Sequence, residues 1–184
     1  MTHKRLTFRS GAREKILSGA TQLADAVRVT LGPKSKSVLI QKKWGVPIVC
    51  NDGVTIAKEL DLEDPEENLG AQMLRQAAVN TGETVGDGTS TSTILAHAIL
   101  ADGIRNVVAG ASAIDIKRGL ERGLGVAVSA LREMSKAVSS RKEKADVATI
   151  SAHNDPAIGE LVAGAMEKVG DDGVITVEES KTTE

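Results

Sequence analysis

The chain reads Gly86-Asp87-Gly88-Thr89-Ser90-Thr91-Ser92-Thr93 directly ahead of an apolar helical pattern over residues 94–99. The glycines let a ligand approach the backbone closely, Asp87 supplies a carboxylate, and the free N–H groups of a helix's first turn favour an anion. This spacing favours a phosphate or nucleotide site. The alternative is a well-capped helix, although a cap needs one side-chain oxygen and six residues here carry one. The stretch is neither a Walker A loop nor a dinucleotide fingerprint, because the Gly-Lys-Ser/Thr of the first and the third glycine of the second are missing.

Composition excludes several classes of protein. The 184 residues are 41% hydrophobic and 26% charged, which is typical of a globular chain with one large domain, or one domain and part of another. A formal charge of −2, with one Phe, one Trp and no Tyr, argues against nucleic-acid binding. The single cysteine, Cys50, rules out an internal disulfide and fits a reducing compartment. Charged residues and glycines interrupt the apolar stretches, so we expect a cytoplasmic protein that spans no membrane.

The first part of the chain predicts a helix and a hairpin. Apolar residues recur with helical period over residues 10–31, and Gly32-Pro33 then favours termination of that helix. Two β-branched runs, residues 37–40 and 46–49, predict a β-hairpin whose second strand is confined to an edge by Pro47.

Acidic residues dominate the next segment. Asn51-Asp52-Gly53 predicts a polar turn that exposes a carboxylate. The acids between Asp61 and Glu67 could suggest a metal site, but Asp64-Pro65 favours a cap and first turn of a helix. That helix is expected to end near Gly82 and to bury Leu69, Met73, Leu74, Ala77 and Ala78.

The second half predicts further helices and a boundary. The helix after the glycine-rich stretch runs to about Gly103 or Gly110, and Ser112 opens another with the cleanest apolar period in the chain. A composition shift over residues 135–144 indicates a domain boundary or hinge. Helices ending at Ser151 and running from Asp155 to Gly170 follow, and then a strand at residues 174–177. Three positions are expected to be structural histidines rather than zinc ligands: His3, His97 and His153.

Motifs along the whole chain closely resemble those of the group I chaperonins, the GroEL type. In the family's order they are Val29-Thr30-Leu31-Gly32-Pro33-Lys34, Asp52-Gly53-Val54, Leu69-Gly70-Ala71-Gln72-Met73, Gly86-Asp87-Gly88-Thr89 and Val174-Ile175-Thr176-Val177-Glu178. The resemblance implies a mainly α fold. Residues 1–135 would be the N-terminal part of a helical equatorial domain with a small β-hairpin, and residues 136–184 the ascending part of an α/β intermediate domain. The chain would correspond to the first third or so of a family member.

The resemblance also implies the site. Thr30, Leu31, Gly32 and Pro33 match a loop against the nucleotide phosphates, and Gly88, Thr89, Ser90 and Thr91 match a phosphate cradle. Asp87 matches the magnesium-binding acid, and Asp52 an acid that positions the attacking water. Asn51 stands where the family usually has lysine. If this position contributes only its backbone carbonyl to a monovalent cation, the change is mild, whereas a side-chain role would be lost. Ile150 and Ser151 match positions near the nucleotide at the domain junction. Ala137 and His153 replace a usual proline at the lower hinge and a usual asparagine.

The implied function is an ATP-driven folding chaperone. Its cofactors would be ATP, Mg²⁺ and K⁺, and its partners other subunits in stacked seven-membered rings, a lid-like co-chaperonin and unfolded client proteins, without nucleic acid or membrane. The alternatives are a chaperonin-like scaffold without turnover and a small ATP-dependent phosphotransferase.

Overall fold

The computed structural model describes residues 6–42, 45–170 and 173–176. By its internal contacts the chain divides into two units, Met1–Gly123 and Leu124–Glu184. The dividing line falls within a helix, so the domain boundary expected near residue 135 stays a prediction.

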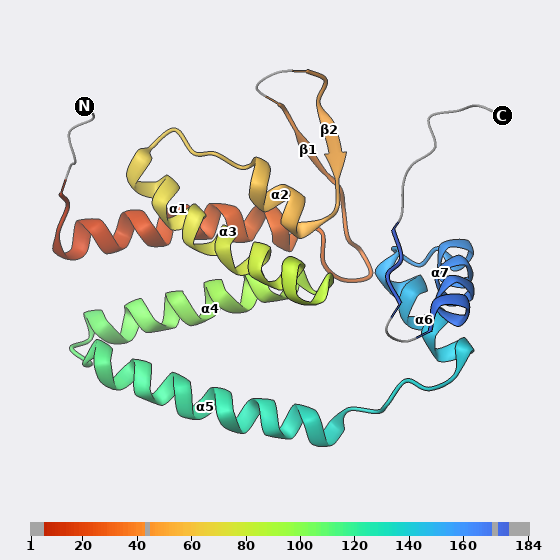
Figure 1. The fold of residues 1–184 in the computed structure, drawn as a ribbon. Helices are drawn as coiled ribbons and strands as arrows, with labels where there is room; N and C mark the ends of the chain where they lie inside the picture. The colour runs from red at the N-terminus through yellow and green to blue at the C-terminus, as the bar shows by residue number, and fades with distance from the viewer. Residues whose placement is uncertain (1–5, 43–44, 171–172, 177–184) are drawn as a thin grey trace. The chain divides into compact units, whose positions relative to one another are not determined.

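The described residues form seven helices and one two-stranded hairpin (Figure 1). This confirms the prediction of a mainly α fold with a small β-hairpin. The elements are α1 (Arg9–Arg28), β1 (Val38–Ile40), β2 (Ile48–Cys50), α2 (Gly53–Glu59), α3 (Pro65–Val85), α4 (Thr89–Val108), α5 (Ala113–Met134), α6 (Arg141–Ser151) and α7 (Pro156–Val169). The strands are antiparallel, with Val38 opposite Cys50 and Ile40 opposite Ile48.

Helices α1 and α3 pack with their backbones in close contact. A Cβ atom on Gly19 would lie 1.7 Å from the Glu67 carbonyl oxygen, and one on Gly70 would lie 2.0 Å from the Ile16 carbonyl oxygen. Glycine is therefore the residue that fits at both positions. The core of the first unit forms beside this crossing from residues of α1, α2 and α3: Ala20, Leu23, Ala24, Val27, Ile56, Ala57, Ala71, Leu74 and Ala78.

The buried face of α3 differs from the predicted one. Leu74 and Ala78 are buried as expected, but Leu69 and Met73 are 54% and 56% exposed. The buried stripe runs through Gly70 and Ala71 instead, because small residues let α1 approach. The prediction was wrong at Leu69 and Met73 because it assigned the large apolar residues to the buried face. Helix α3 also continues past Gly82 to Val85.

The acidic segment before α3 is a helix cap, as the cap interpretation predicted. Asp64 accepts hydrogen bonds from the N–H groups of Glu66 and Glu67, and Pro65 occupies the first turn. Lys15 of α1 donates to Asp64 at 2.5 Å and to Glu67 at 3.0 Å. These bonds raise the pKa of Lys15 to about 12, and they lower the pKa values of Asp64 and Glu67. The Lys15 contacts thus tie the starts of α1 and α3 together.

The second unit contains α6 and α7, which pack on each other. Ser140 and Glu143 form a capping box at the start of α6, and Asp155 caps α7 as predicted. Residues 173–176 have no regular secondary structure, so the described part of the expected strand is not a strand, and Val177 lies outside the described residues. Within the described ranges, no helix is long and apolar enough to cross a bilayer.

Gly70→Ala should destabilise the chain, whereas Gly103→Ala on α4 should not. The new methyl group at position 70 would meet the backbone carbonyl of Ile16, and overpacking of this kind costs about 1–3 kcal/mol. Position 103 has no atom within 4 Å of an added Cβ, and alanine there gains up to about 1 kcal/mol of helix propensity. Urea unfolding followed by circular dichroism measures both. Equal unfolding midpoints for the two variants would show that the crossing is not tight.

Candidate functional site

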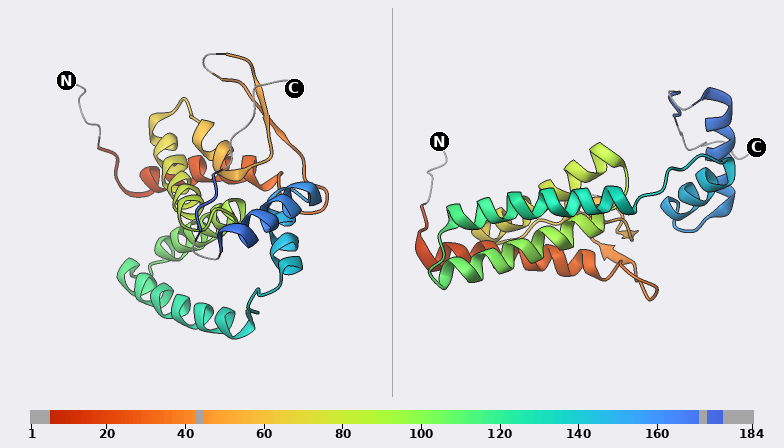
Figure 2. Two further views of the ribbon diagram at one scale, coloured as in Figure 1. Left: turned by 45° about the vertical axis from the view of Figure 1, so that its right-hand side comes forward. Right: turned by 90° about the horizontal axis from the view of Figure 1, so that it is seen from below.

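Helices α1 and α4 lie side by side and run in opposite directions (Figure 2). The His97 Nε2 atom lies 3.0 Å from the Thr21 hydroxyl oxygen. Because that hydroxyl donates to the Leu17 carbonyl, the ring nitrogen is the donor, and His97 is a structural histidine as expected. Near the opposite ends of the two helices, Arg13 of α1 and Ile104 of α4 line the same groove. The antiparallel packing brings the loop after α1 to the start of α4.

The start of α2 packs directly on the first turn of α4. A Cβ atom on Gly53 would lie 2.3 Å from the Ser90 hydroxyl oxygen and 2.9 Å from the Ser90 backbone nitrogen. A Cβ atom on Gly82 would make ordinary contacts with methyl groups of Thr89 and Val54, at 3.5 and 3.7 Å. Three predicted segments therefore gather at one end of the first unit: the loop after α1, Asp52 before α2, and the stretch from Gly86 to Thr91.

The turn between α3 and α4 contains two glycines in the left-handed conformation. Gly86 ends α3 with φ 75°, and Gly88 is the N-cap residue of α4 with φ 76°. Between them, Asp87 is exposed and its carboxylate accepts from the Gly88 N–H at 2.6 Å. Glycine offers no side-chain oxygen, so the well-capped helix is wrong for this terminus, and the N–H groups of the first turn are not taken by the N-cap side chain.

The five hydroxyl residues after Gly88 do not act alike. The hydroxyls of Ser92 and Thr93 donate to the Thr89 carbonyl at 3.0 and 2.7 Å, which commits them to the helix. Thr89 is buried, Ser90 is half-buried and Thr91 is exposed. Fewer side-chain oxygens can therefore face a ligand than the six oxygen-bearing residues of the sequence suggest.

The loop after α1 is closed on itself. Helix α1 ends at Arg28, and the Lys36 N–H then donates to the Val29 carbonyl at 2.8 Å. Gly32, with φ 85°, lies inside this loop and does not cap the helix. The prediction that α1 ends at Gly32-Pro33 is therefore wrong in position. Thr30 is half-buried and its hydroxyl donates to the Val27 carbonyl at 2.8 Å.

Asp52 is the N-cap residue of α2 and not part of a simple turn. Its Oδ2 atom accepts from the Thr55 N–H at 2.9 Å and from the Thr55 hydroxyl at 2.7 Å. Asp52 is half-buried and Asn51 is exposed. Thr55 was not among the predicted site residues, although its position three residues after an N-cap acid is the spacing of a capping interaction.

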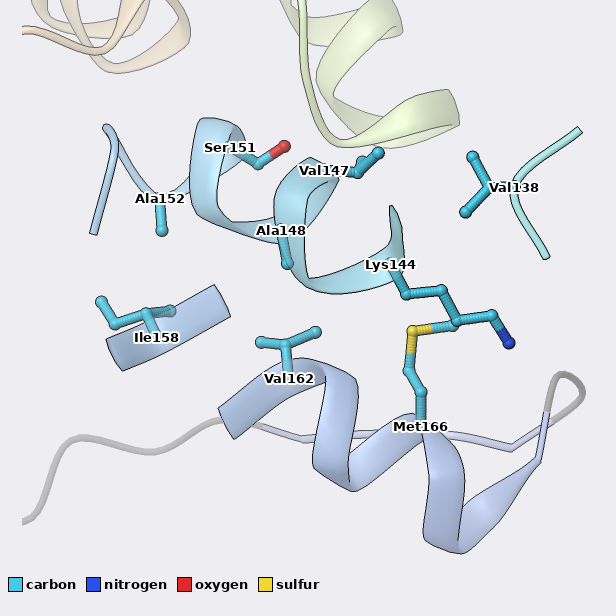
Figure 3. A pocket seen from close by; sticks show the side chains of 9 residues that line it. All are labelled: Val138, Lys144, Val147, Ala148, Ser151, Ala152, Ile158, Val162 and Met166. Atoms are coloured by element: carbon cyan, nitrogen blue, oxygen red, sulfur yellow. The ribbon is translucent and has the colours of Figure 1, made fainter. Parts of the chain in front are cut away.

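Ile150 and Ser151 belong to the second unit, so their place at a nucleotide stays a prediction. Ile150 is 68% exposed at the end of α6. Ser151 lines a hollow of about 700 Å³ between α6 and α7 (Figure 3). This hollow is mostly apolar, and its other lining residues are Val138, Lys144, Val147, Ala148, Ala152, Ile158, Val162 and Met166. None of them is a predicted phosphate-binding residue.

Gly53→Ala should loosen the start of α4, whereas Gly82→Ala should not. An added methyl group at position 53 would clash with the backbone of Ser90, while one at position 82 meets only methyl groups at contact distance. Amide hydrogen exchange at residues 89–93 should therefore accelerate only in the first variant, because local opening of that turn becomes easier. Unchanged exchange in Gly53→Ala would remove the evidence that Asp52 is held beside this turn.

Comparison with known proteins gives three findings. The sequence model of the TCP-1/cpn60 chaperonin family matches residues 23–184. The chain is 77% identical over all its 184 residues to Chaperonin GroEL 5 of Bradyrhizobium diazoefficiens, and spans 34% of that protein. It also resembles the crystal structure of a group III chaperonin in the open state, with a TM-score of 0.73 and 27% identity over 89% of this chain and 33% of the other. The chain thus spans about a third of the length of the relatives it matches.

Proposed function

The chain belongs to the TCP-1/cpn60 chaperonin family, and from this premise we propose that it carries part of the ATP site of a protein-folding chaperonin subunit. The observation that carries the proposal is the contact of Gly53 with Ser90, because it holds the residue after Asp52 against the first turn of α4, which directly follows Asp87 and Gly88. Two acids beside a glycine-capped helix start are suited to phosphoryl transfer. That reaction depends on holding the phosphates, the metal and the nucleophile in line.

Each part of the site has a proposed role. Gly88, Thr89, Ser90 and Thr91 form the phosphate cradle. The backbone N–H groups of the first turn of α4 and the hydroxyls of Thr89, Ser90 and Thr91 bind phosphate oxygens, since Gly88 supplies no capping side chain. The closed loop with Thr30, Leu31, Gly32 and Pro33 binds the phosphates from the end of α1. Asp87 holds Mg²⁺, which when bound neutralises phosphate charge.

The remaining roles concern the water, the second cation and the domain junction. Asp52 orients the attacking water, and the backbone carbonyl of Asn51 serves K⁺. Ile150 and Ser151 approach the nucleotide from the intermediate domain, in a movement about a hinge near Ala137 that the bound phosphates favour.

We propose that the whole subunit works as other members of the chaperonin family do. Subunits would form stacked seven-membered rings in the cytoplasm, bind unfolded client proteins and use a co-chaperonin lid.

The exposed apolar face of α5 supports the proposal that other parts of the full-length subunit cover this helix. Along α5, which is described throughout, no side chain is buried, and its large apolar residues Leu124 and Leu131 are each 64% exposed.

In the full-length subunit, Asp87→Ala should weaken Mg²⁺-dependent ATP binding by more than about tenfold, because it removes the acid beside the phosphate cradle. Asp52→Ala should leave affinity within about twofold and slow hydrolysis at least tenfold, since a water-orienting acid acts mainly in the transition state. Calorimetric titration and steady-state phosphate release measure the two effects.

Asp102→Ala is the matched control for these variants. Asp102 lies on α4, the helix that follows the turn with Asp87, but its carboxylate pairs with exposed Arg105 at 2.7 Å, and a surface pair of this kind contributes little. Loss of binding with normal turnover in Asp52→Ala would reverse the two acids' roles. A full-length protein that binds ATP without phosphate release would be a scaffold, and ATP turnover by particles no larger than one subunit would indicate a phosphotransferase.

The 184-residue chain by itself should neither hydrolyse ATP at a useful rate nor form rings. Even 400 Å² of core surface left unburied forgoes about 10 kcal/mol at 25 cal/mol per Å², which is comparable to the stability of a domain. We therefore expect a loosely packed or associating chain, to be measured by sedimentation and a phosphate-release assay. Ring-sized particles with Mg²⁺-dependent turnover would show that no further chain is needed.

A further inference from the structure

We propose that Thr55 is a positioning residue that holds the Asp52 carboxylate in one orientation beside the start of α4. The inference rests on the proposed role of Asp52 in hydrolysis and concerns how that acid is aimed. It starts from the hydrogen bonds that Asp52 makes.

Nearly every polar atom of Asp52 is committed to a neighbour. Its N–H donates to the Cys50 sulfur at 3.3 Å, and its carbonyl accepts from the Ile56 N–H at 3.1 Å. Its Oδ2 atom accepts both the N–H and the hydroxyl of Thr55. Among the described residues, none donates to Oδ1, so this oxygen is the acceptor that Asp52 can offer to a water molecule.

The second bond to Oδ2 sets the orientation of the carboxylate. With the N–H bond alone, the group can rotate about its Cβ–Cγ bond and present either oxygen to the helix. The Thr55 hydroxyl, at 2.7 Å, adds a charge-assisted bond to the same oxygen from a different direction. Two donors at different positions fix the plane of the carboxylate, and the position of Oδ1 is fixed with it.

The backbone places this fixed carboxylate at the proposed phosphate cradle. Gly53, the next residue, contacts the Ser90 backbone so closely that a Cβ atom would not fit. A displacement of a reacting group by about 1 Å can cost 10²-fold in rate, so the orientation of a water-binding oxygen has a direct effect on turnover.

The test compares two substitutions at position 55 in the full-length subunit. Thr55→Val keeps the shape and the capping N–H but removes the hydroxyl, whereas Thr55→Ser keeps the hydroxyl. For Thr55→Val we expect kcat for ATP hydrolysis to fall on the order of tenfold with KM within about twofold, because positioning acts in the transition state. Thr55→Ser should return kcat to within about twofold of the parent value.

Two further variants separate this inference from the proposed function. Asp52→Ala tests the acid itself, and the double variant Asp52→Ala/Thr55→Val tests whether Thr55 acts through it. Parent turnover in Asp52→Ala would overturn the proposed role of the acid. If Asp52→Ala is slow, the inference is overturned by parent kcat in Thr55→Val, by equal losses in the Val and Ser variants, or by a further loss in the double variant. A slow Thr55→Val, a restored Thr55→Ser and a double variant equal to Asp52→Ala would establish it.

Discussion

The rest of the first unit depends on the close crossing of α1 and α3 at Gly19 and Gly70. At these two points no side chain separates the backbones, so the helices meet along faces of small residues. The core beside the crossing accordingly contains four alanines of these two helices, Ala20, Ala24, Ala71 and Ala78, and few large side chains. Helix α4 packs on both partners, and its first turn comes to lie at the end of α1 and the start of α2. The candidate site is therefore a consequence of how three helix ends are brought together.

Features set by local chemistry could be predicted from the sequence. Asp64-Pro65 and Asp155-Pro156 each carry a capping carboxylate and a first-turn proline, and both open helices where expected. The hairpin could be predicted because its two β-branched runs flank a polar segment. The family followed from motifs spread along the chain, and the match to residues 23–184 confirms it.

Features set by tertiary contacts could not be predicted in this way. Met73 looks like a core residue, but the neighbouring small residues decide which face of α3 meets α1. Gly32 has the sequence of a helix terminus, yet a bond between Lys36 and Val29 makes it part of a closed loop. At the site, local sequence singled out Asp52 and Asp87 as carboxylates, but their roles came from the resemblance. The contact of Gly53 with Ser90 joins residues that are remote in sequence, and the periodicity of apolar residues does not predict such contacts.

Glycine serves two opposite purposes in this chain. At Gly19 and Gly70 the limit is volume, because any side chain would occupy the space of a neighbouring backbone. At Gly86 and Gly88 an added Cβ would meet no atom within 4 Å, and the limit is handedness: the backbone there adopts a conformation that L-residues disfavour. Asparagine, which tolerates that conformation, is therefore an admissible substitute on steric grounds in the turn around Asp87 and an inadmissible one at the helix crossing. The turn around Asp87 is thus selective for chirality, and the helix crossing for size.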